Sequence, residues 1–144
     1  PDRMRIPRVL ALLLLCPALA VAQQLPRTEL SAGVHLIRAE VADNFVTRMQ
    51  GLMHRPSMGA NEGMLFIFDE PGIQCMWMKN TLIPLSVAYI ADDGSIVNIE
   101  DMKPQTENSH CAARPARFAL ASGHVKSPPI PYAHRVCSRH LRMQ

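Results

Sequence analysis

The stretch 75-CMWMKNTLIPLSVAYIADDG-94 predicts part of a β-sheet. Its apolar run Leu85–Ile90 has the composition of a buried strand, and Asp93-Gly94 between two apolar runs is typical of a hairpin turn. After that turn, residues 95–101 alternate polar and apolar side chains, as a half-buried partner strand does. The stretch therefore indicates an antiparallel hairpin.

More strands are expected on both sides of this hairpin, because short apolar and β-branched runs recur along the chain. A turn is predicted at 69-DEPG-72, where proline takes the second turn position, and a polar loop is predicted over residues 103–115. The expected further strands cover residues 34–41, 64–68, 73–78 and 117–120. This pattern predicts a mostly-β domain, a compact sandwich or barrel with one short helix.

That helix is expected over residues 44–51, where Asp43 precedes it as a capping residue. Phe45, Met49 and Leu52 recur at helical spacing and so form one apolar face.

The N-terminal text 4-MRIPRVLALLLLCPALAVAQQ-24 predicts a secretory signal peptide over residues 1–22, cleaved after Ala22. A membrane anchor is the first alternative, but the apolar run is shorter than a bilayer span and Pro17 interrupts it. A lipoprotein anchored at Cys16 is the second. We expect a periplasmic or secreted protein without a stable membrane anchor, in which residues 23–33 form a linker before the domain at 34–121.

The net charge of +3 is unevenly distributed. Residues 34–121 contain seven Lys and Arg against ten Asp and Glu, and no basic cluster. We therefore do not expect this domain to bind nucleic acid, although the net charge of the whole chain is positive. The tail over residues 122–144 carries four basic residues, no acidic ones and no strand alternation, and is expected to be a disordered or frameshifted extension.

At this point four motifs show a resemblance to a known family. They are 51-GLMHRPSM-58, 62-EGMLFIFDEPG-72, 75-CMWMKNTLIPLSVAYIADDGSIVNI-99 and 115-PARFALA-121. In this order they resemble DUF192, a domain of unknown function that is often exported. The resemblance covers about residues 34–121 and implies a compact β-sandwich or barrel. The tail after Ala121 departs from the family pattern, which implies that a last strand is missing.

Cys75 and Cys111 both lie inside the predicted domain, and an exported protein meets an oxidising compartment. A disulfide between them would join the 103–115 loop to the strand that carries Trp77. Two buried thiols are the alternative. Cys137 lies in the tail and has no expected role.

The motif around Trp77, Lys79 and Asn80 has two interpretations. Trp77 could form the wall of a shallow ligand pocket with Lys79 and Asn80 as its polar groups, completed by Arg55 and Glu62. Alternatively, Trp77 is a core residue and Asn80-Thr81 belong to a turn. The leading hypothesis is a small-ligand-binding domain whose ligand is unknown and which needs no cofactor.

Two rival functions use other chemistry. The first rival is an enzyme that acts on an envelope substrate, with Lys79 and Glu62 as the smallest set of groups for acid–base catalysis. No established catalytic motif is present in the sequence. The methionines offer thioether ligands that suit Cu(I), with Met76 and Met78 joined by His54 or His110. Against copper, methionine is also a common filler of apolar cores.

Overall fold

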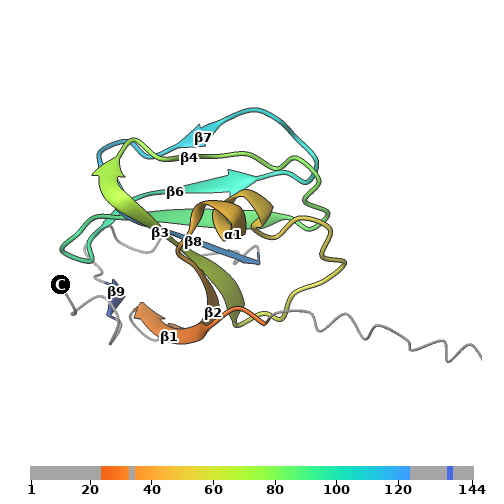
Figure 1. Cartoon of the computed structure of the whole chain (residues 1–144), viewed down its shortest axis with the longest axis horizontal. Coiled ribbons are helices and arrows are strands. Elements are labelled where there is room, and N and C mark those ends of the chain that lie inside the picture. The colour runs from red at the N-terminus through yellow and green to blue at the C-terminus, as the bar shows by residue number, and fades with distance from the viewer. Residues whose placement is uncertain (1–23, 33–34, 124–135, 138–144) are drawn as a thin grey trace, which may run out of the picture.

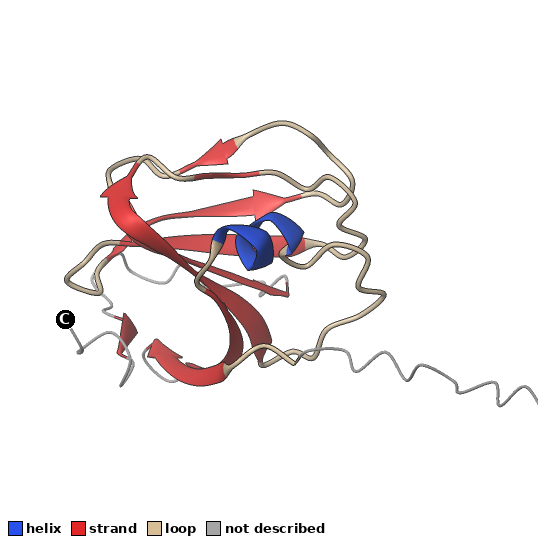
Figure 2. Cartoon of the chain, viewed as in Figure 1, coloured by secondary structure: helices blue, strands red, loops and turns tan. Residues whose placement is uncertain are grey.

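The computed structural model describes residues 24–32, 35–123 and 136–137. These residues form a mostly-β fold with one short helix, as predicted (Figures 1 and 2). The elements in chain order are β1 (Arg27–Ala32), β2 (His35–Ala42), α1 (Phe45–Gln50), β3 (Glu62–Gly72), β4 (Cys75–Met76), β5 (Leu85–Ile90), β6 (Ile96–Met102), β7 (His110–Cys111), β8 (Ala116–Gly123) and β9 (Val136–Cys137).

Seven of the strands form one curved sheet in the order β6-β5-β8-β3-β2-β1-β9. Neighbours in this sheet are antiparallel except β2 and β3, which run parallel. The parallel pair needs a crossover connection, and α1 lies within it. The two end strands, β6 and β9, do not pair with each other in the described part of the chain, so this sheet is open rather than a closed barrel.

The central strand β3 is buried on both faces. Met64 and Phe66 point into one apolar cluster, whereas Leu65 between them belongs to the cluster on the opposite side of the sheet. Strand side chains alternate between faces, so a continuous apolar run such as 64-MLFIF-68 indicates cover on both sides. The fold therefore has a sandwich-like arrangement in which two apolar layers flank the middle of the sheet.

Two glycines are required by this arrangement. Gly94 has φ 82° in the turn between β5 and β6, which confirms the predicted hairpin. Gly63 lies where β3 and β8 approach closely: a Cβ there would be 2.6 Å from the carbonyl oxygen of Ala121. Any side chain at residue 63 would push these two strands apart.

Strands β4 and β7 form a separate two-stranded ribbon, in which Cys75 lies opposite Cys111. These cysteines form a disulfide, as predicted. The fully buried side chain of Tyr89 on β5 reaches the ribbon and donates a hydrogen bond from its hydroxyl to the backbone carbonyl of His110. Burial raises the pKa of Tyr89 far above its ordinary value, so this donor stays protonated at physiological pH.

The predicted linker over residues 23–33 is wrong for 27–32, which form β1 and pair with β2 along their whole length. Thr28 and Leu30 of β1 are buried, so this mostly polar segment contains the alternation of a strand. The predicted domain also extends further, since β8 continues to Gly123. Val136–Cys137 of the expected disordered tail pairs with β1 as β9.

The remaining residues of the tail and the predicted signal peptide lie outside the described residues. Within the described part of the chain, no helix is long and apolar enough to cross a membrane.

Three further local predictions are corrected. The 69-DEPG-72 stretch does not end its strand: β3 continues to Gly72 through an irregularity between Ile67 and Gly72, where strands tolerate proline. The strand expected over 73–78 is reduced to Cys75–Met76, because its partner β7 has only two residues. That partner lies within the expected 103–115 loop.

Helix α1 begins one residue later than predicted. Asn44, not Asp43, is its N-cap: the Asn44 side chain accepts the Thr47 N–H at 3.0 Å, and the Thr47 hydroxyl oxygen accepts the Asn44 N–H. The predicted apolar face is only partly buried. Leu52 is in the core, but Phe45 and Met49 are 72% and 52% exposed.

The disulfide should contribute about 4 kcal/mol to the free energy of unfolding, because it closes a loop with a sequence separation of 36 residues. We expect the double variant Cys75→Ser, Cys111→Ser to unfold at a lower urea concentration than the wild type. Reductant should lower the wild-type midpoint to that of the double variant and leave the variant unchanged. An unchanged wild-type midpoint under reductant would show that the disulfide does not stabilise the fold.

Candidate functional site

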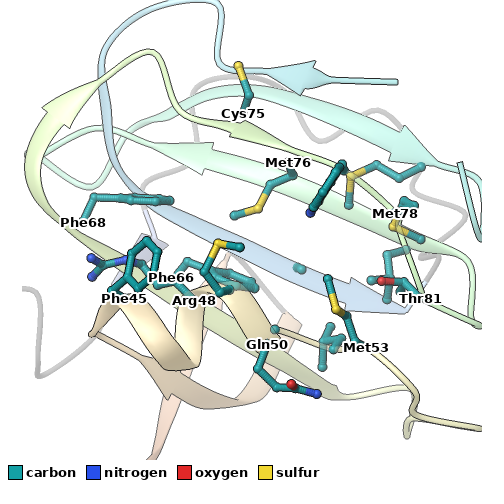
Figure 3. Close-up of a pocket in the computed structure, with 17 residues that line it drawn as sticks. Phe45, Arg48, Gln50, Met53, Phe66, Phe68, Cys75, Met76, Met78 and Thr81 are labelled. Atoms are coloured by element: carbon teal, nitrogen blue, oxygen red, sulfur yellow. The ribbon is translucent and has the colours of Figure 1, made fainter. Parts of the chain in front are cut away.

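An apolar hollow of about 280 Å³ lies between α1, the central strands and the segment that follows β4 (Figure 3). It is lined by side chains from the helix and its C-terminal turn, from β3, from 75–78 and from the buried sheet face. The lining residues are Phe45, Arg48, Met49, Gln50, Gly51, Leu52, Met53, Phe66, Phe68, Cys75, Met76, Trp77, Met78, Thr81, Leu85, Met102 and Ala121. Five of these are methionines and four are aromatic.

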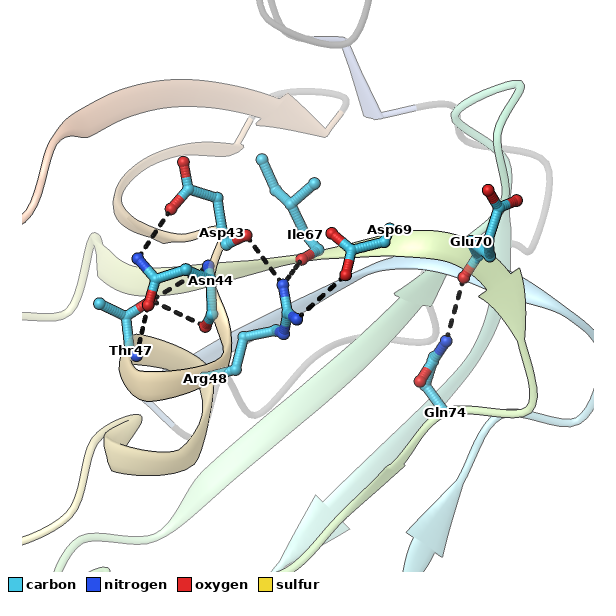
Figure 4. A network of polar contacts seen from close by, with 8 residues as sticks. All are labelled: Asp43, Asn44, Thr47, Arg48, Ile67, Asp69, Glu70 and Gln74. Atoms are coloured by element: carbon cyan, nitrogen blue, oxygen red, sulfur yellow. Dashed lines mark hydrogen bonds and ion pairs between the residues drawn. The ribbon is translucent and has the colours of Figure 1, made fainter.

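The helix wall of the hollow is held in place by Arg48 (Figure 4). Its guanidinium donates hydrogen bonds to the backbone carbonyls of Asp43 and Ile67, both at 2.8 Å, and contacts the Asp69 carboxylate at 3.5 Å. The same guanidinium lies 5.7 Å from the ring centre of Phe68. Arg48 thus ties the start of α1 to β3, so that Phe45 faces the hollow from a fixed position.

The opposite wall comes from 75–78. In a regular strand Met76 and Met78 would face away from Trp77, but all three side chains line the hollow. Regular strand geometry ends at Met76, so the alternation of sides ends with it. Met78 is buried, and Trp77 is 43% exposed at the rim.

Lys79 lies beside Trp77 but is not among the residues that line the hollow. Its ammonium nitrogen is 5.2 Å from the centre of the Trp77 ring and 3.7 Å from the carboxylate of Glu107. Both charged side chains are largely exposed, so water screens their attraction. Lys79 and Trp77 therefore lie side by side, and their role in ligand binding stays a prediction.

Asn80 has a different role. Its backbone is left-handed, with φ 55°, and its carbonyl accepts the His54 N–H at 2.9 Å. The following Thr81 donates its hydroxyl to the Lys79 carbonyl. Asn80 and Thr81 therefore form the local turn that the second interpretation of the motif predicted, and this turn places Trp77 and Lys79 at the rim.

Arg55 lies apart from this hollow. It binds the carboxylate of Glu40 through two hydrogen bonds of 2.6 and 2.8 Å and lines a second hollow of about 420 Å³. Arg27 lies 3.7 Å from the same carboxylate. The hydrogen bond from Arg55 lowers the pKa of Glu40, and the bond to Glu40 raises the pKa of Arg55.

Glu62 is exposed and accepts the Gly59 N–H at 3.0 Å, which closes the turn before β3. Among the five residues predicted for the ligand pocket, Trp77 alone is in the lining of the apolar hollow, with Lys79 beside it. Sequence reasoning missed Phe45, Met49 and Arg48 as site residues. The helical spacing of Phe45 and Met49 showed that they share an apolar face, but it did not show that this face borders a hollow.

The DUF192 sequence profile, described as "Uncharacterized ACR", matches residues 27–125 of this chain. The chain belongs to the DUF192 family. No relative is found among curated proteins.

Two crystal structures are similar to this member of DUF192. A protein from Sinorhizobium meliloti 1021, provisionally described as a transcription regulator, is 34% identical with a TM-score of 0.71, over 78% of this chain and 92% of that one. A protein of unknown function from Novosphingobium aromaticivorans DSM 12444 is 26% identical with a TM-score of 0.73, over 85% of this chain and 91% of that one.

The Arg55–Glu40 pair should make stability depend on pH. Because the folded-state pKa of Glu40 lies below the ordinary value of 4.5, the pair stabilises the fold above about pH 4.5 and less as the pH falls. We expect the difference in free energy of unfolding between wild type and Glu40→Gln to be largest at pH 7 and to shrink at pH 3.5. In an Arg55→Gln background, this pH dependence should largely disappear; a difference that is constant with pH would contradict the assignment.

Proposed function

We propose that this DUF192 domain is a binding module that takes a small apolar ligand into the hollow between α1 and 75–78. The exposure of Phe45, Met49 and Trp77 carries this proposal. Large apolar side chains on a protein surface mark a binding site when they gather in one place. Here all three line one hollow that is continuous with the buried core.

The composition of the lining supports a binding role. Pockets for small ligands are mostly apolar and aromatic with few polar groups, as this one is. Its methionines are unbranched and flexible, so they can adapt to a ligand's shape. Both walls are anchored, the helix by the hydrogen bonds of Arg48 and the ribbon by the covalent Cys75–Cys111 disulfide.

Export through the predicted N-terminal signal peptide is part of this proposal. A disulfide is stable in an oxidising compartment and rare in the cytosol. The Cys75–Cys111 bond therefore supports a periplasmic or secreted location.

Two other functions receive less support. Regulation of transcription, as provisionally described for the Sinorhizobium protein, does not suit a domain with more acidic than basic residues. An enzyme that uses Lys79 with Glu62 would need to bring together two side chains that have separate partners, Glu107 and the Gly59 backbone.

Binding of N-phenyl-1-naphthylamine, a neutral apolar dye, tests the proposed hollow. Trp77 is the chain's single tryptophan, so energy transfer from it to the dye locates the bound dye. We expect Met49→Gln to weaken binding about fivefold, because it removes about 1 kcal/mol of apolar contact. The control is Leu36→Gln: Leu36 is 51% exposed, against 52% for Met49, but does not line the hollow. Equal effects of the two substitutions would contradict the proposal.

A Cu(I) site is the second candidate, favoured by the five methionines in the lining. It predicts that the double variant Met76→Leu, Met78→Leu loses Cu(I) in competition with bicinchoninate, whereas Met58→Leu, outside the lining, keeps it. The apolar-ligand proposal predicts instead that dye binding by the double variant stays within about twofold of wild type, since leucine conserves volume. Together the two titrations distinguish the candidates.

A further inference from the structure

We propose that the ligand of this hollow is an amphipathic anion, whose apolar body fills the hollow and whose negatively charged head group binds Lys79 at the mouth. This inference rests on the proposed apolar-ligand function and adds the chemical class of the ligand. It has three supports: the charge of the lining, the position of Lys79 and the size of the hollow.

The lining of the hollow carries positive but no negative charge. Arg48 is the single charged residue among the lining residues within the described part of the chain. Its side chain is only 17% exposed and is held by the two backbone carbonyls and Asp69. An anion entering the hollow would be attracted by this fixed cation, whereas a cationic ligand would find no carboxylate in the lining.

Lys79 is placed where the head group of a bound ligand would emerge. Its ammonium lies against the Trp77 ring, and that ring forms part of the lining. The partner of Lys79 is Glu107, which is 66% exposed and 3.7 Å away. Such an exposed pair is worth little, so a ligand carboxylate could replace the Glu107 contact at low cost while staying in contact with water.

The size of the hollow suits a small apolar body. Its volume of about 280 Å³ lies close to the lower end of the range for small-ligand pockets, which begins at about 300 Å³. A body of about eight to ten non-hydrogen atoms suits that end of the range, as in a medium-chain or an aromatic carboxylic acid. Octanoate is a suitable probe, and octan-1-ol is its uncharged counterpart with the same chain.

The experiment measures displacement of N-phenyl-1-naphthylamine by octanoate and by octan-1-ol at pH 7.5 and low salt. We expect the wild type to bind octanoate about three to ten times more tightly than octanol, and this preference to fall with added NaCl. Lys79→Met should remove most of the preference by weakening octanoate alone. Glu107→Gln should increase it, because Lys79 then has no competing carboxylate.

Arg114→Met is the matched control, since it removes one positive charge at an exposed position outside the lining. It should keep the wild-type preference, and equal urea midpoints would show that all variants fold. The inference is overturned if octanol competes as well as octanoate, if the preference survives Lys79→Met, or if octylammonium is the strongest competitor. If the dye itself does not bind, the proposed apolar-ligand function fails, and this inference fails with it.

Discussion

Burial of both faces of the central strands is the constraint on which the rest of this structure depends. Strands β3, β5 and β8 place apolar side chains on each side of the sheet, so each side needs cover. On one face that cover is helix α1 together with the β4–β7 ribbon. The helix has six residues, none of them buried, and is too short to close the face. The apolar hollow is what this incomplete cover leaves between the helix and the ribbon.

The two walls of the hollow are fixed by hydrogen bonds and a disulfide in addition to apolar packing. Arg48 ties the helix to β3 through backbone carbonyls, and the Tyr89 hydroxyl reaches the β7 backbone from the core. The disulfide then joins β7 to β4. Directional bonds of this kind hold Phe45, Met49 and Trp77 partly exposed, although apolar burial alone would favour closing the gap. Apolar side chains left exposed in this way cost stability relative to a closed face, which is common at functional sites.

The motif 76-MWMKNT-81 combines a structural turn with a candidate site. Asn80 and Thr81 make a tight turn, with the Asn80 carbonyl bonded to the His54 N–H, and the regular strand before it ends at Met76. Because strand alternation stops there, Trp77 lies at the rim of the hollow between two methionines that also line it. Lys79 is then held over the Trp77 ring at the opening. The turn is a structural feature, and its consequence is a candidate binding site.

Local patterns in the sequence were sufficient to predict the mostly-β fold, the hairpin at Gly94, the short helix and membership of the DUF192 family. They also predicted the Cys75–Cys111 pairing, because the compartment expected for an exported protein favours disulfides. These features depend on side-chain periodicity, turn residues and motif order, which are properties of neighbouring residues. Strand β1 was missed because Thr28 and Leu30 are separated by a polar residue in a mostly polar segment. Its pairing with β2 identifies it as a strand, and this pairing is not visible in the local sequence.

Only the tertiary structure decided which residues share a site. Sequence reasoning grouped Arg55 and Glu62 with Trp77, but Arg55 pairs with Glu40 in a second hollow and Glu62 closes a turn. It placed Phe45 and Met49 on one apolar face, because helical spacing shows that two side chains share a face but not what that face meets. Convergence of the helix and the ribbon on one hollow depends on long-range contacts of Arg48 and Tyr89, and no local pattern encodes these distances.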